Sequence, residues 1–183
     1  MNRNYIASEL VKVAKEMVSS KYNNPIDQWL VDNGWKETGG IALYTNPKFP
    51  LVGIDTNSDT AAVEVFKSKS AIFNDEGSLV EYTDNLGKLK KAVAKGAMIG
   101  RIWVALKKKY PTYKAYMPTS SLSFFANRDD EVSFKVFTDN WTVRVGGYGP
   151  EGVSKRMSPN LRNILKFIEE SQQKILAGGG ERR

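Results

Sequence analysis

The order of hydrophobic periods along the 183-residue chain is the feature that most limits its fold. Short segments with strand-like alternation occupy residues 41–73, and a long helical period follows over 86–109. The same order returns with strand-like segments over 113–146 and a helical period to about 177. Periods of about two and 3.6 residues are typical of half-buried strands and amphipathic helices. We therefore predict an α+β fold with two antiparallel strand-rich halves, each of four strands followed by one helix.

Turn-forming residues set the limits of the expected strands. A tight turn is expected at Ser68-Lys69, and the sequence Asn74-Asp75-Glu76-Gly77 closes the first set. In the long helix Gly96 and Gly100 lie one turn apart, which would let another element approach closely. The expected strands cover 41–45, 51–56, 62–67, 70–73, 113–117, 122–126, 132–138 and 141–146.

Helical signals also occur at both ends of the chain. An apolar stripe predicts a helix over 5–19, and a short helix is expected after Pro25, so that residues 1–36 form an N-terminal helical extension. Ser158 is expected to cap the last helix, with Pro159 at its first position. The main domain then covers 37–178, with halves 40–109 and 112–177 and a flexible tail over 179–183.

The repeated order of elements suggests a test for internal duplication. At one offset Glu64-Val65-Phe66 aligns with Lys135-Val136-Phe137, and Ala71-Ile72 falls on Thr142-Val143. With four extra residues in the second half, Asn85-Leu86 aligns with Asn160-Leu161. Two similar supersecondary units can also arise without duplication, so both readings stay open.

The residue types that are missing restrict the chemistry. The chain has no cysteine and no histidine, which excludes thiolate or imidazole metal sites, cysteine nucleophiles and Ser-His-Asp triads. An enzyme would have to use carboxylates, lysine, hydroxyl groups or bound Mg²⁺. No apolar run reaches the roughly 18–20 residues that cross a bilayer, and no secretory signal is evident. We expect no cofactor and no membrane contact, and we expect the protein in the cytoplasm.

Charge is distributed unevenly along the sequence. The net charge is +7, and the stretch from Leu86 to Arg128 contains no acidic residue. Acids cluster on both sides of this stretch, at 75–84 and at 129–131. Such one-signed patterning favours a polyanionic partner. The basic residues of the stretch are Lys88, Lys90, Lys91, Lys95, Arg101, Lys107, Lys108, Lys109, Lys114 and Arg128.

Aromatic residues lie on or beside the expected strands, next to this basic stretch. Single-stranded nucleic acid is commonly bound by cations that contact phosphates and by aromatic rings that stack on bases. The sequence therefore indicates binding of single-stranded RNA or DNA with little sequence specificity, although any one of these aromatic rings can instead belong to the core. The homo-oligomeric state stays open. The candidate binding residues are Lys67, Lys69, Lys88, Lys91, Lys95, Tyr113, Lys114, Tyr116, Arg128 and Trp141.

The doubled four-strand-plus-helix order resembles the Whirly and Pur-type single-stranded nucleic-acid-binding proteins and the related mitochondrial guide-RNA-binding proteins. In Whirly proteins a Lys-Gly-Lys-Ala-Ala-Leu segment contributes to binding. The segment from Lys67 to Ile72, Lys-Ser-Lys-Ser-Ala-Ile, is similar but differs at Ser68 and Ser70. The resemblance covers about residues 40–177 and implies that Lys67 and Lys69 reach phosphates. Separately, residues 7–16 are similar to leader helices of phage-encoded proteins.

Three alternatives remain at this level. Asp55, Glu64 and Lys67 resemble the carboxylate and lysine set of Mg²⁺-dependent nucleases, but regular alternation would place Lys67 on the opposite strand face from Glu64. The glycine-rich loop 146–150 is either a connector or a phosphate-binding loop, and it lacks the spacing of the known nucleotide motifs. A viral structural or interaction protein that binds an acidic protein partner would show the same basic surface.

Overall fold

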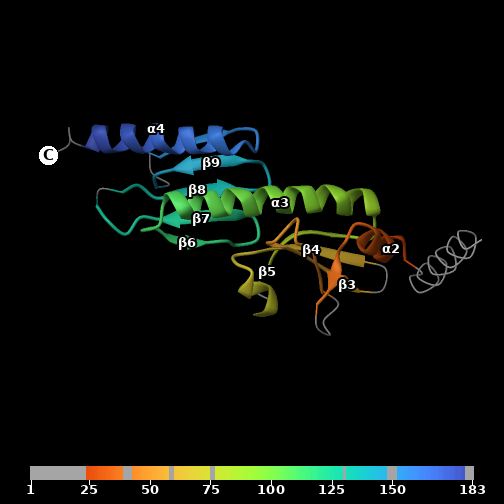
Figure 1. The fold of residues 1–183 in the computed structure, drawn as a ribbon. Coiled ribbons are helices and arrows are strands. Elements are labelled where there is room, and N and C mark those ends of the chain that lie inside the picture. Colours follow the sequence, from red (N-terminus) through yellow and green to blue (C-terminus); the bar gives the residue numbers. More distant parts are fainter. Residues whose placement is uncertain are drawn as a thin grey trace, which may run out of the picture.

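The computed structural model describes residues 24–38, 43–57, 60–74, 77–129, 131–147 and 152–179. Over these residues the chain forms two antiparallel sheets, each followed by a helix (Figure 1). This arrangement confirms the predicted α+β class. Each sheet has five strands rather than the four that were expected.

The first sheet, sheet A, is a meander in which each strand pairs with the next along the chain. In its centre Val52 pairs with Val65 and Ile54 pairs with Val63, so that these apolar side chains share one face. The register shifts between Val63 and Glu64, where β4 pairs with β5. The strands are β1 Lys36–Glu37, β2 Leu43–Thr45, β3 Val52–Asn57, β4 Thr60–Phe66 and β5 Gly77–Thr83.

The second sheet, sheet B, is also an antiparallel meander. Leu122 pairs with Val136 and Phe124 pairs with Phe134, which places four apolar side chains on one face. The strands are β6 Lys114–Tyr116, β7 Ser121–Phe125, β8 Phe134–Phe137, β9 Thr142–Val145 and β10 Val153–Arg156.

The expected strand over 70–73 and the turn before it are wrong. Ser70–Asn74 form a short 3-10 helix, η1, which lies in the connection between β4 and its antiparallel partner β5, so no tight turn at Ser68-Lys69 joins two strands. Ala71 and Ile72 are buried with Leu43 and Phe66, so η1 covers the side of sheet A that α3 does not cover. The segment is apolar because its side chains are buried, and a short apolar segment of this kind can be a buried strand or a buried helical turn.

Three helices are described. The helix α2 Pro25–Asp32 begins at Asn24, whose side chain accepts a hydrogen bond from the backbone N–H of Ile26. The helix α3 Leu86–Lys109 begins at Asn85 in the same way, and α4 is Leu161–Gly179. The expected Ser158 cap is wrong, because the Asn160 side chain accepts from the N–H of Asn163 at the start of α4. An asparagine side chain at this position satisfies a backbone donor that the helix itself leaves open.

The helix α3 packs on both sheets and joins the two cores. Leu89 and Val93, in its first half, are buried with α2 and the strands of sheet A. Ile102, Trp103 and Leu106, in its second half, are buried with the apolar face of sheet B and with α4. Figure 1 shows the helix running alongside both sheets. A single helix therefore fixes how the two halves lie relative to each other.

Gly96 and Gly100 of α3 permit a close approach, as expected. A Cβ atom on Gly96 would lie 3.2 Å from Val65 Cγ2, and one on Gly100 would lie 3.4 Å from Leu51 Cβ. A side chain at Gly96 would therefore press against Val65 of β4, whereas a methyl group at Gly100 would make an ordinary contact with Leu51. These glycines lower helix propensity by about 1 kcal/mol each, a cost that the close packing offsets.

The short helix α2 is part of the core of the first half. Ile26, Leu30 and Trp35 are buried with Tyr44 and Ile54 of sheet A. The residues that the sequence assigned to an N-terminal extension therefore include a packed helix at their C-terminal end. The helix expected over 5–19 and the end of the tail, 180–183, lie outside the described residues.

The two halves share their order of elements, but the sequence alignment of their strands is wrong. Glu64-Val65-Phe66 lies in the fourth strand of sheet A, whereas Lys135-Val136-Phe137 lies in the third strand of sheet B. The alignment of Asn85-Leu86 with Asn160-Leu161 does place the two helix starts together. The similarity is therefore one of topology and helix capping.

Candidate nucleic-acid interface

Strand alternation separates sheet B into two faces. The face with Leu122, Phe124, Val136 and Val143 packs against α3 and α4. Side chains that alternate with these residues point to the other side of the sheet. We call that side the outer face of sheet B, and it lies on the opposite side of the sheet from α3.

The outer face of sheet B is basic. Its positions follow from the cross-strand pairs, for example Ser123 with Lys135 and Lys135 with Arg144. It carries four cationic residues, several small hydroxyl residues and three aromatic rings, and none of its strand positions is acidic. The outer-face residues are Lys114, Tyr116, Ser121, Ser123, Phe125, Lys135, Phe137, Thr142, Arg144, Ser154 and Arg156.

Two aromatic rings stand out from this face. Tyr116 is 53% exposed and Phe125 is 51% exposed, and the two side chains lie on the neighbouring strands β6 and β7. Their ring centroids are 5.7 Å apart at an interplanar angle of 73°. In this edge-on arrangement each ring keeps part of its face open to solvent, so that the pair offers a platform on which a planar group can stack.

A hollow of about 320 Å³ adjoins this platform. Its lining includes Phe125, Lys135, Arg144 and Gly147. The Arg144 guanidinium donates two hydrogen bonds to the Gly147 carbonyl oxygen, Nε at 3.1 Å and Nη2 at 3.0 Å, which holds it at the rim. The Lys135 ammonium lies 4.9 Å from the centre of the Phe137 ring. The hollow thus combines an aromatic wall with two positive charges.

Of the predicted binding residues, Lys114 and Tyr116 lie on the outer face of sheet B. Tyr113 and Trp141 do not, because both pack against the core. The Tyr113 ring lies 5.6 Å from that of Phe134, and its hydroxyl accepts a hydrogen bond from Gln172. These two aromatic residues support the sheet from the helix side.

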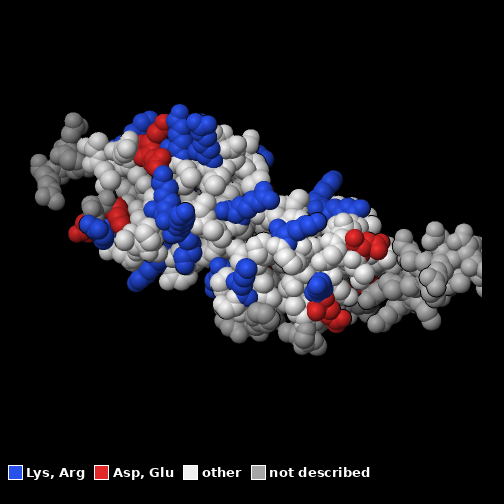
Figure 2. Space-filling view, in the orientation of Figure 1, with Lys and Arg blue, Asp and Glu red and all other residues white. Residues whose placement is uncertain are grey.

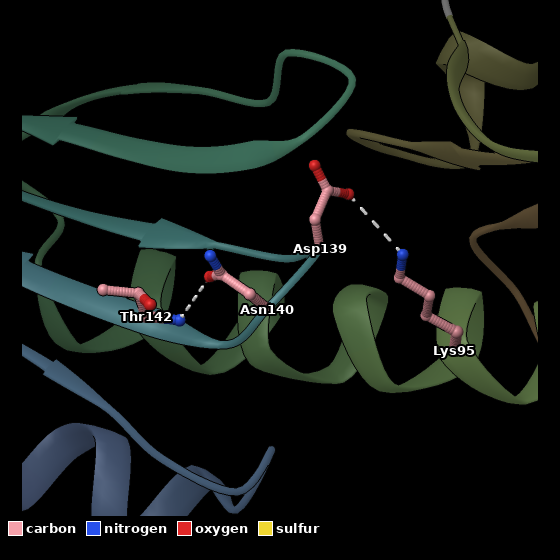
Figure 3. A network of polar contacts seen from close by, with 4 residues as sticks. All are labelled: Lys95, Asp139, Asn140 and Thr142. Carbon is pink, nitrogen blue, oxygen red and sulfur yellow. Dashed lines mark hydrogen bonds and ion pairs between the residues drawn. The ribbon is translucent and has the colours of Figure 1, made fainter.

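The predicted lysines of α3 lie on the opposite side of the molecule. Figure 2 shows this side, where Lys and Arg side chains spread along the helix and Asp and Glu are fewer. Part of this charge is compensated. Lys95 Nζ lies 3.6 Å from Asp139 Oδ1, in the turn after β8 (Figure 3), and Lys109 forms an ion pair with Glu169 of α4. Lys88 and Lys91 are exposed near the start of the helix.

The remaining predicted cations lie in loops. Lys67 and Lys69 are exposed between β4 and η1, beside the side of sheet A that η1 covers. The Trp103 indole N–H donates to the Lys67 carbonyl oxygen at 3.0 Å, which holds this loop against α3. Arg128 is exposed in the turn between β7 and β8. The predicted residues therefore belong to several surfaces and not to one.

The cross-strand pairs put both carboxylates of the nuclease alternative, Asp55 and Glu64, on the face of sheet A that lies away from α3. Asp55 is exposed on β3, while the Glu64 carboxylate lies over Gly77 of β5. Strand β4 ends at Phe66, so Lys67 lies beyond the strand. Within the described residues, no group of three or more Asp and Glu side chains is arranged to hold a metal ion.

Three cations of the outer face, Lys135, Arg144 and Arg156, were not among the predicted binding residues. They follow the acidic residues at 129–131, whereas the acid-free stretch ends at Arg128. The signal that would have found them is strand alternation, since Lys135 lies between Phe134 and Val136 and Arg144 lies between Val143 and Val145. Of the glycine-rich loop, only Gly146 and Gly147 are described.

Comparisons with protein-family models, with curated proteins and with solved structures found no match to this chain. None of the helices in the described part of the chain has the length and apolar character needed to cross a membrane.

Proposed function

We propose that the protein binds single-stranded nucleic acid, RNA or DNA, on the outer face of sheet B. The observation that carries this proposal is the combination of four cations, two half-exposed aromatic rings and no acidic strand position on one sheet face. Proteins that bind unpaired strands without sequence preference use this combination. We also propose that the protein acts in the cytoplasm, as expected from the sequence.

Each part of the face has a chemical role in this proposal. Lys114, Lys135, Arg144 and Arg156 neutralise phosphates, and binding releases the counterions that those phosphates held. Tyr116 and Phe125 stack on bases, which requires that the bases be unpaired. Stacking and phosphate contacts are largely insensitive to base identity, so we expect low sequence specificity.

The outer face of sheet B is a better candidate than α3 for two reasons. Lys95 and Lys109 of α3 already have carboxylate partners, Asp139 and Glu169. In addition, the large apolar side chain exposed on α3 is an aliphatic one, Val104 at 54%, and not an aromatic platform. The α3 side remains the natural place for an acidic protein partner, should the chain have one.

A charge-matched comparison tests the proposal. The variant Lys114→Glu/Lys135→Glu and the control Lys107→Glu/Lys108→Glu each lower the net charge from +7 to +3, because each change replaces one positive charge with one negative charge. Affinity for a fluorescent single-stranded oligonucleotide is measured at several salt concentrations. Losing two phosphate contacts should lower the salt slope by about 1.4 in the sheet variant, and the helix-end control should keep its slope. Circular dichroism confirms that both variants are folded.

Three further variants separate the remaining possibilities. Tyr116→Ala should weaken binding by about 1–3 kcal/mol, whereas Tyr82→Ala, which removes a tyrosine that is 59% exposed on sheet A, should have little effect. The Whirly-like segment is tested by Lys67→Glu/Lys69→Glu, which changes the charge by the same amount. Equal losses in all three charge pairs would mean that only bulk charge matters and would refute the assignment to sheet B. No binding at low salt would refute the function itself.

A further inference from the structure

A second hollow, of about 400 Å³, lies between α3 and the segment that precedes β3. Its walls are mainly apolar and include Phe49, Leu51 and Val104. Val104 is 54% exposed although it is a large apolar residue in a helix. An apolar hollow of this size is within the usual range for small-molecule sites.

The walls of this hollow are held by contacts elsewhere in the fold. The Phe49 ring is stacked on buried Trp35, with centroids 5.7 Å apart and an interplanar angle of 18°. Gly100 has no side chain to fill the space beside Leu51. The hollow is therefore formed by the packing of the core, and a ligand would not need to create it.

Charge at the hollow has a single sign. Three cationic residues line it. Lys48 belongs to the segment before β3, and Arg101 and Lys108 lie two turns apart on α3. None of the described residues that line the hollow is acidic. Lys95 and Lys109, the two lysines of α3 that form ion pairs with Asp139 and Glu169, do not line the hollow.

We propose that this hollow binds a small amphiphilic anion, a molecule with an apolar body and one carboxylate or similar head group. The apolar body contacts Phe49, Leu51 and Val104, where its burial removes apolar surface from water. The head group remains near Arg101 and Lys108, whose side chains extend along the apolar wall and keep their charges in water. The site faces away from the outer face of sheet B, and it does not depend on nucleic-acid binding.

Calorimetric titration with decanoate, decanol and decyltrimethylammonium tests this site, all below the concentration at which they form micelles. Decanoate should bind saturably, decanol more weakly, and the cationic probe not measurably. The double change Arg101→Gln/Lys108→Gln should raise the Kd for decanoate roughly three- to thirtyfold, because two exposed charge contacts are lost. The control Lys91→Gln/Lys107→Gln removes the same charge from exposed positions of α3 outside the lining and should leave the Kd unchanged.

Three results would overturn the proposal. They are the absence of saturable decanoate binding, equal binding of the anionic and cationic probes, and equal losses in the two double variants. Repeating the titration with saturating single-stranded oligonucleotide should give the same Kd for decanoate. Competition between the two would instead place the oligonucleotide on the α3 side and contradict the independence of the two sites.

Discussion

Replacing Gly96 or Gly100 tests how closely α3 packs against sheet A. The same substitution, Gly96→Ala or Gly100→Ala, adds one methyl group to the buried side of the same helix. Both changes gain about 1 kcal/mol of helix propensity. They differ in what the added methyl group contacts. A Cβ atom at Gly96 would lie 3.2 Å from Val65 Cγ2, whereas a Cβ atom at Gly100 would lie 3.4 Å from Leu51 Cβ and 3.7 Å from Leu51 Cδ1.

These distances predict different changes in the free energy of unfolding at the two positions, and a further change for a larger side chain at Gly96. At Gly100 the methyl group makes an ordinary contact, so Gly100→Ala should raise the free energy of unfolding by up to about 1 kcal/mol. At Gly96 the tighter contact offsets the gain, and the net change should be close to zero. Gly96→Leu overfills the space above Val52 and Val65 and should lower the free energy of unfolding by about 1–3 kcal/mol.

Urea unfolding followed by circular dichroism measures these differences, and thermal unfolding gives a second reading. A change of 1 kcal/mol should move the Tm by about 2–4 °C in a chain of this size. If Gly100→Ala were the more destabilising of the two alanine variants, or if Gly96→Leu were neutral, the close packing of α3 on sheet A would be refuted.

Other predictions concern single contacts, each read out by urea unfolding. Asn85→Ala removes the side chain that caps α3 and should cost about 1 kcal/mol; no loss would show that the cap is not formed. A double-mutant cycle on Lys95 and Asp139 should give a coupling of at most about 1 kcal/mol that weakens with salt, because the pair is partly exposed. Burial raises the pKa of Tyr110 above its ordinary value of 10.0. The protonated hydroxyl is therefore favoured in the folded state, and stability should fall as the pH rises above about 10. Tyr110→Phe should reduce that fall, and an unchanged pH profile would contradict the assignment.

The spacing of apolar residues along the sequence was enough to predict the helices and strands that bury one face and expose the other. The long helix 86–109 and the alternating strand around Phe134 are examples. The strand β10, by contrast, has four exposed residues at the edge of its sheet, so no apolar alternation marks it. The strand β5 is interrupted by a register shift, which breaks its period of two.

The candidate site was predicted only in part, because its residues come together through strand pairing and are not neighbours in the sequence. Lys114 and Tyr116 lie in the acid-free stretch and were found. Lys135 and Arg144 come after the acidic turn in the sequence, yet cross-strand pairing places them next to the same surface. A run of charge along a sequence describes neighbours on the chain, whereas a sheet brings together residues that are far apart in sequence. Strand register is therefore the information that was missing.

Photocrosslinking tests the central proposal most directly. A single-stranded oligonucleotide that carries 5-iodouracil is bound to the protein and irradiated, and the crosslinked residues are identified by mass spectrometry. We expect crosslinks at Tyr116 and Phe125, the two half-exposed rings of the outer face of sheet B. Crosslinks confined to the α3 side, for example at Trp29, whose ring lies 5.7 Å from Lys90 Nζ, would contradict it.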